Sequence, residues 1–290
     1  MFRWIFAIAL AVVLPGLPAQ AAGPFKSGRF TVEVEGAGPD VILIPGLATS
    51  RAEFADLAQR LADHYRLHLI QVAGFAGDPP GPNAQGPVIA PLVEELHRYI
   101  AARGLKRPAI IGHSMGGLIG LLIAEQHPQD LGRLMIVDAL PFYPAIVSPT
   151  ITLAQVEPVA AQLRDAVIAA TPAQYVASEV QTAQRLSKTS RGQALVADWG
   201  SRSDQGVAAR ATYDDMTTDA RPGLAAVQVP VTVLYAWDAV MGPQAAVDGL
   251  YAGQYASLPR KMLSRVDGSF HFIPLDEPGA FAAAVSSFLK

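Results

Sequence analysis

The residues best suited to chemistry are a serine and the small residues around it, in the run Gly112-His113-Ser114-Met115-Gly116. Apolar, β-branched residues precede this run, and a helical pattern follows it over 118–124. A serine on a sharp strand-to-helix turn has a strained backbone, so the residues two positions to either side must be small. The spacing therefore predicts a nucleophile elbow that exposes the Ser114 hydroxyl. The alternative is an ordinary glycine-rich turn.

A serine hydroxyl is a weak nucleophile, so the prediction requires a base and an acid elsewhere in the chain. His271 lies on a loop between the last predicted strand and the final helix. Asp238 follows a late predicted strand upstream of it, which gives the chain order serine, aspartate, histidine. We expect Asp238 to be the acid; Asp138, one strand earlier, and Asp267 remain alternatives.

Acyl transfer also needs two backbone N–H groups aimed at the developing oxyanion. One comes from Met115, directly after the serine. The loop 45–48, which follows the apolar run 41–44, offers the second donor at Leu47. In the alternative interpretation this loop is only a turn that ends a strand.

These residues need a sheet to position them. Continuous apolar runs, typical of strands buried on both faces, alternate with helical patterns, which indicates a parallel sheet covered on both sides. The segment 30–35 alternates as an edge strand does, and its Gly-Pro turn predicts a hairpin with the next strand. Ser50 to Glu53 has the spacing of a helix capping box. The predicted buried strands cover 41–44, 67–72, 134–137, 231–235 and 261–266.

The strand signal disappears between residues 139 and 226, where helical stretches are expected at 153–169, 172–186 and 193–199. We interpret 139–226 as a helical lid inserted into a core made of 22–138 and 227–290. The alternative is that it only covers a sheet edge. Aromatic and methionine side chains in this segment are candidates to contact substrate, although each could equally belong to the core of the lid: Phe142, Tyr143, Trp199, Tyr213 and Met216.

The N-terminus resembles a secretory signal. Arg3 precedes the apolar stretch 4–14, and Ala19-Gln20-Ala21 has the form of a cleavage site, so 1–21 is the predicted signal peptide. We expect a periplasmic or secreted protein with no stable membrane anchor after cleavage; an uncleaved anchor is the alternative. The chain has no cysteine, which excludes a thiol nucleophile and disulfides.

Composition narrows the class of partner. The chain has 290 residues, of which 51% are hydrophobic and 16% charged, with a formal net charge of -3. A sequence of this length buries a large core, and it has no basic block with interleaved aromatics. We therefore expect a small-molecule substrate, not nucleic acid, and the chemistry of Ser114 and His271 needs no metal or organic cofactor.

The Gly-His-Ser-Met-Gly-Gly run at 112–117, with the strand, acid and histidine order, resembles the alpha/beta-hydrolase fold superfamily, in particular its lidded serine hydrolases. The chain departs from that family at Pro45, where histidine is frequent, and at Phe270, where glycine is usual. The resemblance implies a mostly parallel, eight-stranded α/β sheet whose first strand is short or missing here. Together with the predicted signal peptide, it leads us to expect an exported esterase for small to medium acyl chains; a lactonase and a non-catalytic binding protein are the alternatives.

Overall fold

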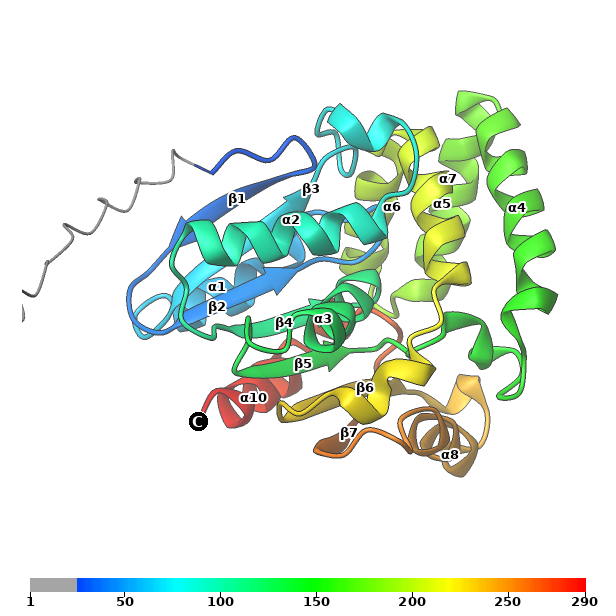
Figure 1. Cartoon of the computed structure of the whole chain (residues 1–290). Helices are drawn as coiled ribbons and strands as arrows, with labels where there is room; N and C mark the ends of the chain where they lie inside the picture. The colour runs from blue at the N-terminus through cyan, green and yellow to red at the C-terminus, as the bar shows by residue number, and fades with distance from the viewer. Residues whose placement is uncertain (1–24) are drawn as a thin grey trace, which may run out of the picture.

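Seven strands form a single sheet in the order β1-β3-β2-β4-β5-β6-β7 (Figure 1). The computed structural model describes residues 25–290, so the predicted signal peptide lies outside the described residues. All neighbouring strands are parallel except β1 and β3. The strands are β1 Phe30–Glu35, β2 Asp40–Ile44, β3 Arg66–Val72, β4 Ala109–His113, β5 Arg133–Val137, β6 Val231–Trp237 and β7 Lys261–Asp267. The predicted α/β class and mostly parallel sheet are confirmed.

The predicted hairpin between the first two strands is wrong. β1 pairs antiparallel with β3, from Phe30 opposite Val72 to Glu35 opposite Leu67. The turn after β1 carries β2 past β3, so that β2 lies between β3 and β4. In this arrangement β2 has a strand partner on each side, as expected for a continuously apolar, buried strand. The alternating strand β1 lies at the edge of the sheet.

Helices cover both faces of the sheet because successive strand residues point to opposite sides. Ile42 and Ile44 pack toward α2 (Ile89–Ala102), α3 (Met115–Gln126) and α8 (Gln244–Gln254). Val41 and Leu43 pack toward α1 (Ala55–Leu61) and α10 (Pro278–Leu289) on the other face. Figure 1 shows α2 and α3 in front of the sheet and α1 and α10 behind it.

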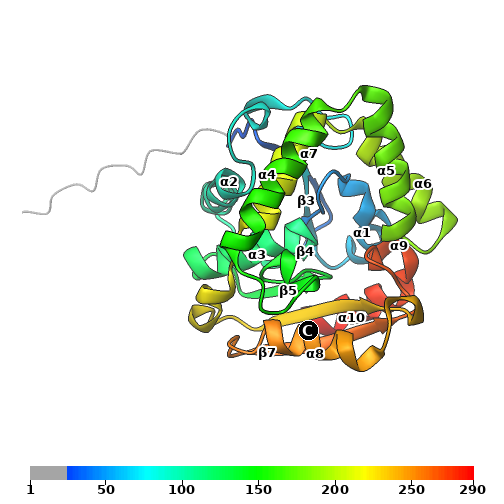
Figure 2. The same ribbon diagram turned by 90° about the vertical axis from the view of Figure 1, so that its right-hand side faces the viewer.

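Four longer helices separate β5 from β6 and lie beyond the carboxyl ends of the strands (Figures 1 and 2). They are α4 Leu153–Ala169, α5 Pro172–Leu186, α6 Ser190–Arg202 and α7 Gln205–Thr217. The helix α4 packs against α7, and α5 packs against α6. The sequence predicted three of them; α7, which Asp204 caps by accepting from the Val207 N–H at 2.8 Å, was missed. We call α4 to α7 the helical insertion.

Short helical turns occupy several connections: η1 Arg51–Phe54, η2 Gly81–Ala84, η3 Tyr143–Ile146, η4 Arg221–Ala226, η5 Ala239–Met241 and α9 Ile273–Asp276. Over residues 25–290, none of the helices combines the length and apolar character that crossing a bilayer demands. Because parallel strands end at one edge, the loops that follow β2, β4, β5, β6 and β7 all meet beneath the insertion.

Candidate active site

Ser114 stands on the turn between β4 and α3 with φ 52° and ψ -124°, a conformation that side-chain-bearing residues rarely adopt. The glycines two residues away make this turn possible. A Cβ on Gly112 would lie 2.1 Å from the Gly116 carbonyl oxygen, and a Cβ on Gly116 would lie 2.2 Å from that of Ile44. The Ser114 N–H donates to the carbonyl of Val137 at 2.9 Å. The structure therefore has the strained strand-turn-helix geometry that the motif indicates.

His271 is hydrogen-bonded to Asp138, not to Asp238. Its Nδ1 lies 2.7 Å from Asp138 Oδ2. The other oxygen, Oδ1, accepts from the Tyr251 hydroxyl and from the Ala236 N–H, both at 2.9 Å. A carboxylate only accepts, so Nδ1 is the donor and the Nε2 of a neutral His271 is left as a base.

The prediction that Asp238 faces the histidine is wrong, and the sheet register explains why. Val137 pairs with His113 on one side and with Leu234 on the other, so Asp138 is level with Ser114. β6 continues three residues beyond Leu234, to Trp237. At about 3.3 Å per residue, this carries Asp238 roughly 10 Å farther along the sheet.

Asp238 has a different set of partners. Its Oδ2 accepts from the Lys188 ammonium at 2.7 Å, and its Oδ1 accepts from the Val240 N–H at 3.1 Å. The hydrogen bond from Lys188 lowers the pKa of the Asp238 carboxyl. Lys188 lies between α5 and α6, so Asp238 ties the core to the helical insertion.

The loop after β2 packs directly against the serine. A Cβ on Gly46 would come within 3.4 Å of the Ser114 Cβ, and Ala48 has a positive φ of 54°. Among residues 25–290, neither the Leu47 N–H nor the Met115 N–H donates a hydrogen bond to a protein acceptor. Both predicted oxyanion donors are thus unused by the protein itself.

The substrate candidates mostly contribute to packing. Phe142 is 0% exposed and belongs to a cluster against which Tyr213 and Met216 pack. The Arg221 guanidinium lies 4.4 Å from the ring centroid of Phe142. Trp199 is 4% exposed and belongs to a second buried cluster. Tyr143 alone is well exposed, at 47%. The Trp199 cluster includes Ala183, Val196 and Phe272, the residue after His271.

The sequence analysis did not identify Asp276, which lies at the end of the short helix α9. This buried carboxylate accepts from the Phe270 N–H at 3.0 Å and from the Lys188 N–H at 2.9 Å. It also accepts from the Ser187 hydroxyl at 2.6 Å. Asp276 therefore joins the loop that carries His271 to the turn between α5 and α6. Its place five residues after His271 is the only sequence signal for this role.

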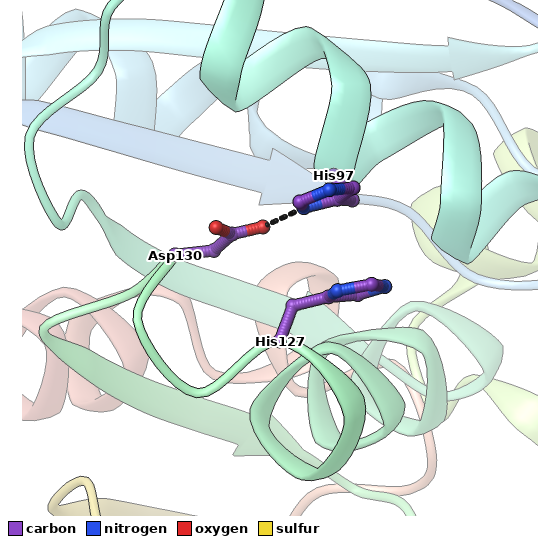
Figure 3. Close-up of side chains that lie close together, drawn as sticks. All are labelled: His97, His127 and Asp130. Atoms are coloured by element: carbon purple, nitrogen blue, oxygen red, sulfur yellow. Dashed lines mark hydrogen bonds and ion pairs between the residues drawn. The ribbon is translucent and has the colours of Figure 1, made fainter.

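A second cluster of titratable groups lies between α2, which carries His97, and the turn after α3, which carries His127 and Asp130. His97 Nδ1 bonds Asp130 Oδ2 at 2.6 Å, and the His97 and His127 rings stack with centroids 3.9 Å apart (Figure 3). A metal ion bound to an imidazole lies in the plane of that ring. These planes are only 8° from parallel, so the two histidines do not converge on one point. As arranged, the cluster is a stacked, hydrogen-bonded group and does not have the geometry of a metal centre.

Known proteins share this fold. Among curated proteins, the Pimeloyl-(acyl-carrier protein) methyl ester esterase of Aeromonas salmonicida (strain A449) is 33% identical over 117 residues, 40% of this chain and 43% of that protein. The matched region thus spans less than half the length of this relative.

Two solved structures cover nearly the whole chain. The enol-lactonase from Burkholderia xenovorans LB400 has a TM-score of 0.72 at 17% identity, over 90% of this chain and 96% of that one. An esterase from Exiguobacterium antarcticum has a TM-score of 0.71 at 19% identity, over 90% and 95% of the two chains. At such identities the likeness concerns the fold alone. The family model described as alpha/beta hydrolase fold matches residues 39–278, and the chain belongs to that family.

Proposed function

We propose that this protein is a serine hydrolase that cleaves carboxylic esters through an acyl-serine intermediate. The observation that carries the proposal is the hydrogen bond between His271 and Asp138, beside a serine held in the strained turn. The His271 ring lies against the ring of His113, the immediate neighbour of Ser114, with centroids 4.7 Å apart. Nucleophile, base and acid thus come from the ends of β4, β7 and β5.

The proposed reaction begins when His271 Nε2 takes the proton of Ser114 as Oγ attacks the ester carbonyl. Asp138 stabilises the resulting imidazolium and keeps Nδ1 as the donor. The N–H groups of Leu47 and Met115 stabilise the oxyanion. The imidazolium then protonates the departing alcohol, and water, deprotonated by His271, releases the acid from Ser114.

The substrate class follows from the chemistry of these groups together with the relatives. The curated relative above is named a methyl ester esterase, and a carboxylic ester needs only the nucleophile, base, acid and oxyanion donors described. Small to medium acyl chains are proposed because the helical insertion lies over the strand ends that carry these groups. A lactone presents the same carbonyl chemistry in cyclic form, so it belongs in the test.

The test is turnover of p-nitrophenyl esters from short to long acyl chains, beside lactones of matched size, by the wild type and Ser114→Ala. We expect ester turnover by the wild type and a loss of about 1,000-fold or more in Ser114→Ala. Faster turnover of lactones than of matched linear esters would make the protein a lactonase. Saturable ligand binding without turnover would make it a binding protein and would refute the proposal.

We also propose that the protein is exported by its N-terminal segment, with cleavage after Ala21. The measurement is N-terminal sequencing of protein recovered from the periplasm or medium of an expressing bacterium. A chain that begins at residue 22 is expected. A full-length chain retained with the membrane would contradict the proposal.

A further inference from the structure

A second carboxylate and imidazole pair lies directly behind the first. Glu53 Oε2 is 3.3 Å from Nδ1 of His113, and both side chains are completely excluded from solvent. The His113 ring faces the His271 ring at a centroid distance of 4.7 Å and an angle of 42°. Glu53 comes from η1, which the sequence predicted as a capping box. Its side chain instead points inward, and only Ser50 acts as a cap.

The direction of the hydrogen bond between His113 and His271 follows from its acceptor. His113 Nε2 lies 3.0 Å from the carbonyl oxygen of His271, and a carbonyl only accepts, so Nε2 carries a proton. Burial alone lowers the pKa of His113, but the Glu53 carboxylate and the hydrogen bonds outweigh burial and raise it. His113 Nε2 therefore donates to the backbone carbonyl of His271, and His113 Nδ1 faces the Glu53 carboxyl group.

A contribution to the stability of the fold does not explain this buried pair. Within residues 25–290, Glu53 Oε1 is buried and has no hydrogen-bond partner, which costs free energy. Apolar residues of similar volume usually replace a buried ion pair at no loss of stability. A pair that carries this cost, beside the catalytic histidine, points to a role at the site.

We propose that the Glu53 and His113 pair positions the general base, by fixing the backbone of His271 relative to Ser114. This rests on the proposed serine hydrolase function. Asp138 holds the His271 ring at Nδ1, but that bond does not set the distance between base and nucleophile. His113 is covalently joined to Ser114 and hydrogen-bonded to His271, so it links the two directly. Glu53 keeps the His113 ring oriented through its contact with Nδ1.

The other charged groups around this site come from different elements. Asp138 faces His271 from the end of β5. Asp276 of α9 bonds the Phe270 N–H, and Lys188 from the insertion bonds Asp238. A change at Glu53 leaves all of these partners in place, so its effect can be separated from theirs.

The first experiment compares two double variants that differ in one donor: Glu53→Gln with His113→Gln, and Glu53→Gln with His113→Leu. Neither leaves an unpaired buried carboxylate, and the glutamine amide offers an N–H where His113 Nε2 stood. We expect the leucine variant to have a kcat about 10-fold lower than the glutamine variant, with KM within about twofold. Equal kcat values at equal thermal stability would overturn the proposal.

The second experiment uses Glu53→Gln alone and follows pH. Without the carboxylate, the largest cause that raises the pKa of His113 is lost, while burial still lowers that pKa. His113, whose ring centroid lies 4.7 Å from that of His271, then carries less positive charge, while the lost Glu53 charge was at Nδ1 of His113. A nearby like charge disfavours the imidazolium that forms on His271 during the reaction, so weakening that charge favours this imidazolium. The acidic limb of kcat/KM should move up by about half a pH unit; an unmoved limb would overturn the proposal.

The same shift can be read without turnover. NMR titration of histidine-labelled protein reports the pKa of His271 in the wild type and in Glu53→Gln. Failure of the hydrolase proposal would appear as no ester turnover by the wild type. Failure of the positioning proposal would appear as unchanged His271 titration or as unchanged His113 titration in the variant.

Discussion

Two aspartates end neighbouring strands of the sheet, and only one of them reaches the histidine. The side chains of Asp138, after β5, and Asp238, after β6, are shielded to the same extent, with 13% exposed in each. Asp138 receives hydrogen bonds from His271, from Tyr251 and from the β6 backbone. Asp238 receives them from Lys188 and from its own loop. The partners, and not the burial, distinguish the two acids.

The backbone around the two acids also differs. Asp138 has a positive φ of 47°, which costs conformational energy in a residue other than glycine. Asp238 has an extended backbone, with φ -137° and ψ 153°, and acts as the N-cap of η5. Strain is tolerated where surrounding contacts fix the residue, as the Asp138 partners do. We conclude that the two roles belong to different strand ends. The acid proposed for the active site follows β5, and the acid that holds the insertion follows β6.

The largest effect is expected for Asp138→Asn. An amide in place of the carboxylate can no longer hold the His271 Nδ1 proton or stabilise the imidazolium, so kcat should fall by about 1,000-fold or more. Steady-state hydrolysis of the best p-nitrophenyl ester measures this, and circular dichroism verifies the fold. A loss below 10-fold would contradict the assignment of Asp138 as the acid.

A smaller effect is expected for Tyr251→Phe, which removes one donor to Asp138. The loss of a single hydrogen bond to the acid should lower kcat by about 3- to 10-fold. Tyr255→Phe is the matched control, because the Tyr255 hydroxyl donates to the Ala139 carbonyl instead. Equal losses of kcat in the two variants would show that the effect comes from packing of α8.

Asp238→Asn and Lys188→Met should change kcat by no more than about twofold, since an ion pair with a half-exposed lysine contributes little. The double variant should match the single ones, because each change already breaks the pair. A 100-fold loss in Asp238→Asn alone would return the acid role to Asp238.

The smallest effect is expected in the pH dependence of stability. Lys188 lowers the pKa of Asp238 below its ordinary value of 3.8, so the stabilisation is present above pH 3.8 and disappears as the pH falls through the lowered value. The melting temperature of the wild type should exceed that of Lys188→Met by about 1–2 °C at pH 6, and by nothing near pH 2. Scanning calorimetry at these two pH values measures it. A gap that persists at pH 2 would mean that packing of the lysine, not its charge, matters.

Spacing in the sequence was sufficient to find Ser114, because the strained turn requires nearby glycines within the same short segment. His271 was found from its place between the last strand and the last helix. The predicted strands agree with the observed ones to within two residues at each end, and the runs at 41–44 and 134–137 are continuously apolar.

The choice between Asp138 and Asp238 could not be made in this way. It depends on how far β6 extends beyond β5, and register is a property of paired strands. Glu53 was misassigned for a similar reason. Its spacing from Ser50 satisfies a capping box, but its partner His113 is 60 residues away in the chain. Local patterns do not report partners at such separations.

The central claim is that Ser114 is the nucleophile, activated by His271. Intact-mass analysis after reaction with a fluorophosphonate, followed by peptide mapping, tests it most directly. The account predicts a single adduct on the peptide that contains Ser114, absent in Ser114→Ala and formed far more slowly in Asp138→Asn than in Asp238→Asn. An adduct that persists in Ser114→Ala, or none in the wild type, would contradict it.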